Sequence, residues 1–270
     1  METHTLLIAF GLTLFAGLST GIGGLIALFT KKTNKKLLSF VLGFSAGVMI
    51  YISLAELLTE SSHGLIEGYG KSIGALISLS SFFIGIAVIA IINKFIPDYE
   101  KLHEVHKVEE VKNRKLANDY GKLYKCGVCT AIALSIHNFP EGIATFTSSL
   151  VNARLGVAIA LAVALHNIPE GISVAIPFFY STNSRRKAVL YSFLSGMTEP
   201  LGALIAFLVL APFLNPVLLS LMFAFVAGIM VYISFDELLP AAREYGEEHM
   251  SIYGIMAGIA VMAFSLVLLV

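Results

Sequence analysis

Two copies of one six-residue motif bring histidine, asparagine and glutamate into apolar stretches of the chain. The copies are His137-Asn138-Phe139-Pro140-Glu141-Gly142 and His166-Asn167-Ile168-Pro169-Glu170-Gly171. Residues four apart lie on one face of an α-helix, so His137 can converge with Glu141, and His166 with Glu170, on a shared ligand. Ionisable side chains at membrane depth are costly and usually functional. The pattern therefore indicates a bound metal cation.

A third carboxylate, Glu199, is predicted at the same depth as the two histidines. His137, His166 and Glu199 each lie eleven residues after the start of an apolar stretch, at residues 126, 155 and 188. At about 1.5 Å per helical residue this is about 17 Å from the helix end, near the midplane of a bilayer. Asn138 and Asn167 add amide oxygens beside the histidines.

The apolar stretches that carry Glu141, Glu170 and Glu199 contain no lysine or arginine. These carboxylates must therefore be protonated or paired with a bound cation. Imidazole, carboxylate and amide groups without thiolates suit divalent zinc, iron, manganese, cobalt or cadmium. Several carboxylates around two His-Glu pairs also suit two metal ions, with Glu141 and Glu170 as bridges. The alternative is a helix-helix hydrogen bond, which a single buried histidine or glutamate often makes.

The elements that must position these residues are membrane-spanning helices. Hydrophobic residues make up 57% of the chain and charged residues 13%, against about 25% charged residues in soluble proteins. Apolar runs of about 20 residues cross a bilayer as helices. The sequence predicts eight, at residues 6–29, 37–60, 72–93, 126–151, 155–180, 188–210, 217–241 and 251–270. We expect an all-α polytopic membrane protein with one domain, residues 1–270, and a cytoplasmic loop at 94–125.

The basic residues predict the orientation of this bundle. If the eight spans alternate, the loops after spans 1, 3, 5 and 7 share one side and hold 16 of the 18 lysines and arginines, leaving only Lys71 and Arg154 opposite. Loops rich in lysine and arginine stay in the cytoplasm. We therefore expect a multi-pass protein of the cell membrane with both termini outside the cytoplasm.

An internal duplication links the two ends of the chain. Residues 46–58 and 227–239 share the pattern Ala-Gly-x-Met-x-Tyr-Ile-Ser-x-x-Glu-Leu-Leu, and residues 23–27 weakly resemble 202–206. The copies lie five spans apart and so run in opposite directions, while spans 3 and 8 share the absence of ionisable residues. A 3+2+3 inverted repeat around spans 4 and 5 is typical of transporters that alternate between two open states.

Four further residues are candidates for a metal pathway: Met49, Glu56, Asp236 and Glu237. Glu56 and Glu237 are equivalent in the repeat, so we expect Glu56 toward the outside and Glu237, with Asp236, toward the cytoplasm. The alternative for both glutamates is a helix end in contact with water. Met49 has its repeat equivalent in Met230, and packing is the simpler role for both.

Two other pairs of potential metal ligands are more simply explained without a bound metal. Cys126 and Cys129 are too few for a disulfide framework, and we expect them to be packed helix residues rather than a soft-metal way-station. His103 and His106 lie in the charged loop, where solvation is more usual than metal capture.

Taken together, the eight spans, the long loop after span 3 and the paired motifs resemble the ZIP family of metal-ion transporters, particularly its bacterial ZupT-like zinc-uptake branch. The resemblance implies a binuclear site. Its ligands would be His137, Asn138, Glu141, His166, Asn167, Glu170 and Glu199.

The same resemblance implies how the chain works. Met49 would reach the site, and Asp236 and Glu237 would line the exit. Import would proceed by movement of spans 1, 4, 5 and 6 against spans 2, 3, 7 and 8, often in a homodimer within the lipid bilayer and without a nucleic-acid partner. The His-Glu-x-Pro-His-Glu form of the span 5 motif found in one eukaryotic branch is absent, as is a long histidine-rich loop.

The predicted function is import of divalent cations, zinc first, with no catalytic cofactor. The alternative is an intramembrane zinc-dependent metalloenzyme, but the chain has no His-Glu-x-x-His sequence. A metal sensor without flux is a third possibility, and no soluble output domain is present in the sequence to support it.

Overall fold

The computed structural model describes residues 3–29, 35–95, 119–210, 213, 215–245 and 249–269, and within these ranges it contains helices and no strand. The helices are α1 (Thr3–Phe29), α2 (Lys35–Tyr51), α3 (Leu58–Tyr69), α4 (Lys71–Phe95), α6 (Asp119–Val151), α7 (Ala153–Thr182), α8 (Arg185–Gly196), α9 (Thr198–Ile205), α10 (Pro216–Ile233), α11 (Leu239–Tyr245) and α12 (Met250–Leu269). Three π-helical segments lie between them, at Ile52–Leu57, Ala206–Leu210 and Ser234–Leu238. The expected all-α membrane architecture is confirmed.

Seven helices in the described part of the chain are long and apolar enough to cross a membrane. They correspond to seven of the eight predicted spans. The predicted fourth span, 126–151, lies within α6, which is helical throughout but is not among the seven. Its second half carries the motif and a run of hydroxyl residues, which lower its apolar character. Helix α6 also begins at Asp119, inside the segment predicted as the 94–125 loop.

Short polar caps set the turns between consecutive spans. Asn152 separates α6 from α7, and its side chain accepts a hydrogen bond from the backbone N–H of Arg154 at 2.9 Å. Helix α7 ends at Asn183 in the left-handed conformation, and Ser184 caps α8 by accepting from the N–H of Lys187. Such caps satisfy backbone groups that a helix end leaves without partners. Neighbouring spans therefore reverse direction within two residues.

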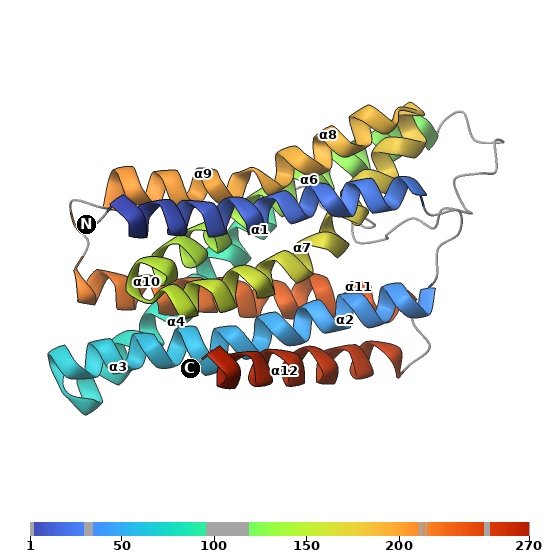
Figure 1. Ribbon diagram of the computed structural model, residues 1–270. Helices are drawn as coiled ribbons and strands as arrows, with labels where there is room; N and C mark the ends of the chain where they lie inside the picture. Colours follow the sequence, from blue (N-terminus) through green and yellow to red (C-terminus); the bar gives the residue numbers. More distant parts are fainter. Residues whose placement is uncertain are drawn as a thin grey trace.

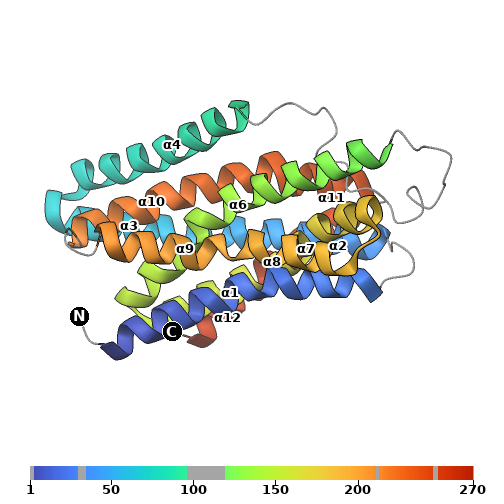
Figure 2. The ribbon, with the colours of Figure 1, turned by 90° about the horizontal axis from the view of Figure 1, so that it is seen from above.

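The helices run side by side along one axis, and the C-terminal ends of α1, α4, α7 and α11 lie at the same end of the bundle (Figures 1 and 2). They form two groups by their packing. In one group, α1 packs along α7 and α8, and α6 packs along α7 and α9. In the other group, α2 packs along α12, and α4 packs along α10. Helices α6 and α7, which carry both motifs, meet the second group through α10, α2 and α12.

Close backbone contacts at glycines relate the two halves of the chain in the first group. Added Cβ atoms at Gly17 and Gly196 would each meet the other residue's carbonyl oxygen. One at Gly23 would overlap the carbonyl of Ile168, and one at Gly202 that of Phe139. Residues 17 and 23 differ from 196 and 202 by the same 179 positions. The weak sequence echo at 23–27 and 202–206 is therefore a true structural repeat with a pseudo-twofold relation.

The second group repeats the arrangement. A Cβ at Gly85 would overlap the carbonyl of Phe225 in α10, and one at Gly258 that of Phe44 in α2. Gly47 and Gly228, equivalent in the duplicated segment, make the matching contacts with α12 and α4. Small residues let membrane helices approach closely and gain van der Waals contact. The inverted repeat thus includes spans 3 and 8. In the sequence, the only evidence that these two spans are equivalent was that both lack charged residues.

Both copies of the duplicated segment also contain a π-helical turn at the same place. It covers Ile52–Leu57 between α2 and α3, and Ser234–Leu238 between α10 and α11. A π-helical turn holds an extra residue, and such turns occur frequently at functional sites. One extra residue rotates the following helix face by about 100°. Glu56 and Glu237 lie within these two turns.

Replacing Gly17 by alanine is expected to lower the free energy of unfolding by about 1 to 3 kcal/mol, because a Cβ there overlaps the backbone of Gly196. Gly11 lies on the same helix with open space around its Cβ position. Gly11→Ala is expected to be neutral or to stabilise by up to about 1 kcal/mol. Thermal unfolding in detergent measures both. Equal melting temperatures for the two variants would contradict the close contact.

Candidate metal site

The two motifs lie where α6 and α7 pack against each other and against α9 and α1. Gly142 and Gly171 end the motifs and allow the closest approaches: a Cβ at Gly142 would overlap the carbonyl of Glu199, and one at Gly171 that of Thr20. The motif glycines therefore hold α6 against α9, and α7 against α1. Pro140 and Pro169 sit inside continuous helices and lack an N–H, which frees the carbonyls of the residues four positions earlier.

His166 and Glu141 make the contact that joins the two motifs. The imidazole Nε2 lies 3.1 Å from Glu141 Oε1, and Nδ1 lies 3.2 Å from the carbonyl oxygen of Ala162. Both side chains are buried, with 1% and 0% of their surface exposed. A carbonyl can only accept, so it selects the tautomer in which Nδ1 carries the proton when the imidazole is neutral. The contact with Glu141 then holds one proton between Nε2 and Oε1. A metal ion that replaces this proton would be bound by Nε2 beside the carboxylate.

Glu199 joins the same region from the first turn of α9. Span 6 is interrupted between α8 and α9, so Glu199 lies at the N-terminal end of a helix, where the dipole favours a negative charge. The amide of Asn167 donates to Glu199 Oε1 and, at 2.9 Å, to the carbonyl of Ala16. Asn138 makes the equivalent backbone contact, donating to the carbonyl of Ser195 at 3.2 Å. Both asparagines therefore turn their amide nitrogens toward helix backbone.

The opposite ends of these amides are suited to a cation. Among the described residues, the buried oxygens Asn138 Oδ1 and Asn167 Oδ1 accept no hydrogen bond. Glu170 is also buried, with 2% of its surface exposed. A buried polar oxygen without a partner is unfavourable by about 1 to 3 kcal/mol. Amide and carboxylate oxygens with a neutral imidazole are a donor set that a divalent metal ion would bind.

The predicted ligands converge only in part. Glu141 meets His166, and Asn167 meets Glu199, but no three His, Cys, Asp or Glu side chains in the described part of the chain are close enough to hold a metal ion. The side chain of His137 is outside the described residues. Glu141 and Glu199 are each hydrogen-bonded to one neighbouring side chain.

The four candidates for the pathway are spread along the bundle. Met49 is fully buried in an apolar cluster with Met230. Glu56 is half-buried in its π-helical turn. Asp236 is exposed and accepts a hydrogen bond from the Asn93 amide at 2.6 Å, while Glu237 is half-buried. The side chains of Cys126 and Cys129, and all of His103 and His106, lie outside the described residues.

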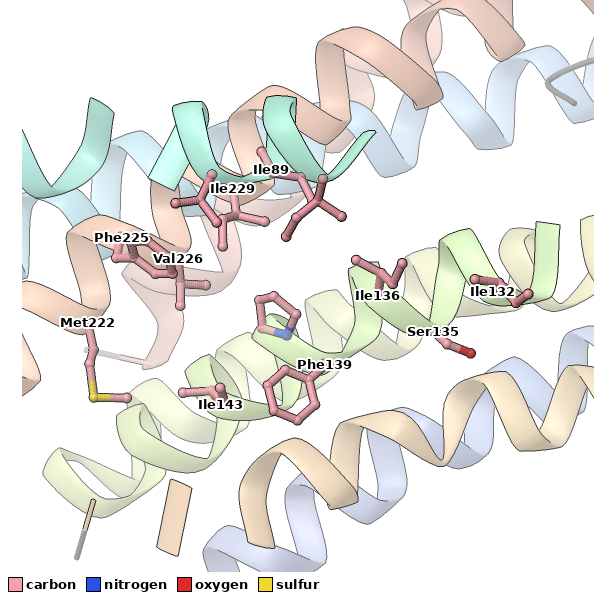
Figure 3. A pocket seen from close by; sticks show the side chains of 13 residues that line it. Ile89, Ile132, Ser135, Ile136, Phe139, Ile143, Met222, Phe225, Val226 and Ile229 are labelled. Carbon is pink, nitrogen blue, oxygen red and sulfur yellow. The ribbon is translucent and has the colours of Figure 1, made fainter. Parts of the chain in front are cut away.

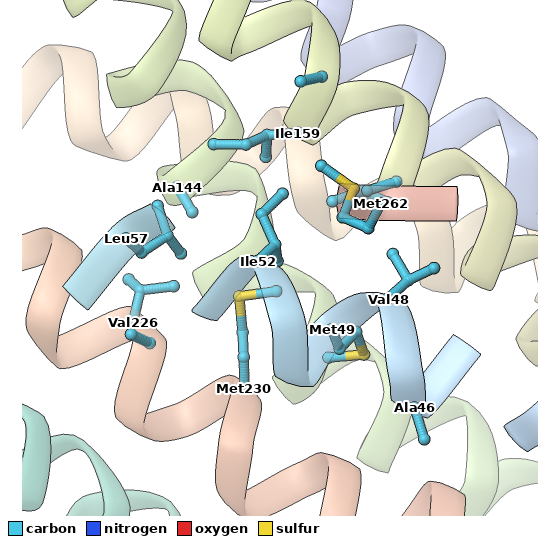
Figure 4. Close-up of a cluster of buried hydrophobic side chains, with 14 of the residues drawn as sticks. Ala46, Val48, Met49, Ile52, Leu57, Ala144, Ile159, Val226, Met230 and Met262 are labelled. Carbon is cyan, nitrogen blue, oxygen red and sulfur yellow. The ribbon is translucent and has the colours of Figure 1, made fainter. Parts of the chain in front are cut away.

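An apolar cluster closes the site on the side of the α6–α7 turn (Figure 4). It joins Ile52 and Leu57 of the α2 side to Ala144 of α6, Ile159 of α7 and Met230 of α10. These residues are almost completely buried. The cluster connects the two helix groups with apolar side chains, while α6 also buries hydroxyl residues toward the same end, among them Thr145, Ser148 and Ser149.

A second apolar space lies behind α6. This pocket of about 600 Å³ is enclosed by α4, α6 and α10, and Ile136, Phe139 and Pro140 form its α6 wall (Figure 3). Its lining contains no ionisable side chain. The pocket therefore separates the two helix groups without offering metal ligands.

The family model described as "ZIP Zinc transporter" matches residues 97–266. The chain is also 58% identical to a protein named zinc transporter ZupT from Lysinibacillus sphaericus (strain C3-41) over 264 residues, which cover 98% of each chain. The chain belongs to the ZIP family. Other ZIP relatives of the same name include those of Clostridium perfringens (strain 13 / Type A), 54% identical over 99% of this chain and 98% of the relative, and Streptococcus mutans serotype c, 51% identical over both complete chains.

Membership of the ZIP family confirms the resemblance that the paired motifs carried. ZIP proteins are multi-pass membrane transporters, and the alternative of an intramembrane metalloenzyme has no support. Sequence reasoning missed the backbone partners of the two asparagines, Ala16 and Ser195. They are small residues without a distinctive side chain, and only the glycine spacing around them signals a close helix contact.

Replacing Glu141 by glutamine is expected to raise the melting temperature of the metal-free protein, because a neutral amide is less costly to bury than a carboxylate. The same change should remove most of the stabilisation by Zn²⁺, which for the native protein is about 2.7 kcal/mol at a hundredfold excess over the dissociation constant. Thermal unfolding after chelation and after Zn²⁺ addition measures both effects. Glu67→Gln, on the exposed face of α3, is the matched control. A full Zn²⁺ response in Glu141→Gln would contradict the site.

Proposed function

We propose that this chain imports divalent cations, zinc first, into the cytoplasm through the site between α6, α7 and α9. The observation that carries this proposal is the buried contact between His166 and Glu141, which joins the two motifs at membrane depth. The names of the ZupT relatives support zinc as the substrate.

The proposed site binds two metal ions. Asn138 and Glu141 on α6, His166, Asn167 and Glu170 on α7, and Glu199 on α9 are the buried donors, and His137 completes the set. Glu141 and Glu170 occupy the equivalent position in each motif and bridge the ions. One divalent ion leaves a net charge of −1 beside three buried carboxylates, and two leave +1, so either occupancy lowers the energy of keeping these groups charged inside the membrane. The duplication of the His-Glu motif supports two ions.

The distribution of polar and apolar side chains supports a direction of cation transport, from the outside to the cytoplasm. If the lysine-rich loops are cytoplasmic, the apolar cluster around Ile52 and Met230 closes the site toward the outside. Asp236 is exposed near the other end and belongs to the release side. The structure then corresponds to a state closed to the outside. Alternation moves the α1, α6, α7, α8 and α9 group against the other, which the limited contact between the groups favours.

Iron, manganese, cobalt and cadmium are proposed as further substrates, because the donor set lacks thiolates that would select soft ions. Glu56 on the outer π-helical turn, and Asp236 and Glu237 on the inner one, are proposed to attract the cation during capture and release. A homodimer also stays a prediction.

Purified protein in liposomes is expected to take up Zn²⁺ from the external buffer, measured with a fluorescent chelator inside. Glu141→Ala and Glu170→Ala should each reduce the rate at least about tenfold, the equivalent of 1.4 kcal/mol. Glu67→Ala, outside the site, should transport normally. Saturable Zn²⁺ binding without uptake would contradict transport and indicate a sensor. Repeating the series with competing Fe²⁺, Mn²⁺, Co²⁺ and Cd²⁺ gives the metal preference.

The orientation has its own test. In a background with Cys126→Ala and Cys129→Ala, a membrane-impermeant maleimide should label Lys71→Cys in intact cells but not Arg185→Cys. Both positions are exposed in the structure. Labelling of Arg185→Cys alone would reverse the proposed orientation and with it the assignment of capture and release sides.

A further inference from the structure

The pseudo-twofold relation between the two halves continues through the metal site. Ser19 donates its hydroxyl to the carbonyl of Ala16, and Thr198 donates to the carbonyl of Ser195 at 2.6 Å. The amides of Asn167 and Asn138 donate to these same two carbonyls, of Ala16 and Ser195. Ser19 and Thr198 are 179 positions apart in the sequence, and so are Ala16 and Ser195.

The same register makes Thr20 the counterpart of Glu199. The carbonyl of Thr20 lies against Gly171 of the second motif, as the carbonyl of Glu199 lies against Gly142 of the first. The Thr20 side chain lies beside Gly196, because a Cβ added there would come within 2.8 Å of Thr20 Oγ1. Gly196 directly follows Ser195, which holds the amide of Asn138. By this register Thr20 occupies, in the half of the site that contains Asn138, the position that Glu199 occupies in the half that contains Asn167.

The hydroxyl of Thr20 is buried without a hydrogen bond that would account for its position. Thr20 is 0% exposed, and its Oγ1 makes no hydrogen bond among the described residues. Buried threonines in membrane helices usually donate to the carbonyl four residues earlier. Thr13 on the same helix does so, bonding to Ala9 at 2.9 Å. The Thr20 hydroxyl and the Asn138 amide oxygen are thus two buried polar atoms without partners on the same side of the site.

We infer that Thr20 is a member of the metal site, where its hydroxyl binds a water molecule of the incoming cation in the half of the site that contains Asn138. This inference rests on the proposed function. A hydroxyl is a weak direct metal ligand but a good partner for metal-bound water.

The two halves then differ in charge for a physical reason. Glu199 lies at the N-terminal end of α9, whose dipole stabilises its carboxylate. Helix α1 continues unbroken past Thr20, so no helix end is available there to stabilise a charge. A neutral hydroxyl makes the Asn138 half the weaker binding position, from which a cation leaves more easily.

Thr20→Val keeps the side-chain volume and removes the hydroxyl. It is expected to raise the KM for Zn²⁺ uptake in liposomes about fivefold, the effect of one lost hydrogen bond, with little change in turnover at saturation. Thr20→Ser, which retains the hydroxyl, should restore the native KM. Thr20→Asp places a carboxylate in the weaker half and should lower the KM and slow turnover, because release becomes harder.

Thr13→Val is the matched control, since it removes a buried hydroxyl from the same helix outside the site. Its KM should equal that of the native protein. Equal kinetics for Thr20→Val and Thr13→Val would overturn the inference, as would a Thr20→Ser variant impaired as strongly as Thr20→Val. Failure of the proposed function would appear separately, as absence of uptake by the native protein or uptake unaffected by Glu141→Ala.

Discussion

Three carboxyl groups are buried far along their helices from any lysine or arginine, and the rest of the structure is arranged around this constraint. In α6 and α7 the nearest basic residue lies 16 positions before the buried glutamate, and α9 contains none. Glu141, Glu170 and Glu199 have at most 2% of their surface exposed. The desolvation of a carboxylate is among the largest unfavourable energies in a protein interior. Here the partners are an imidazole that shares a proton with Glu141, and an amide and a helix end at Glu199. Such partners hold the oxygens in place and still leave positive charge to be supplied by the cargo.

Close helix packing makes this arrangement possible. The carboxylates and asparagines reach one another because glycines on α1, α6, α7, α8 and α9 bring backbones into contact. The backbone carbonyls of Ala16 and Ser195 then hold the asparagine nitrogens. These contacts are formed within one helix group. The apolar cluster that includes Met49 and Met230 is formed by both groups and lies between them. Polar recognition therefore belongs to one group, and closure depends on apolar contact between the two, a division that suits alternation between two states.

The sequence predicted the features that depend on residue type and period. The two motifs, seven of the spans and the duplicated segment at 46–58 and 227–239 could be recognised because their side chains are distinctive. The sequence could not show that the repeat between spans 1 and 6 continues beyond residues 23–27 and 202–206. The equivalent residues there, such as Ala16 and Ser195 or Thr20 and Glu199, differ chemically and share only a backbone role. The start of α6 at Asp119 was missed because a polar helix end resembles a loop in composition.

The matched π-helical turns at Ile52–Leu57 and Ser234–Leu238 have a consequence for symmetry. Each holds one residue more than an α-helical turn. An extra residue in one half alone would shift the faces of that helix relative to its copy. Because both copies carry the turn around the equivalent residues Glu56 and Glu237, the faces of α3 and α11 are shifted alike, and the two copies keep the same pattern of inward and outward side chains beyond the turn.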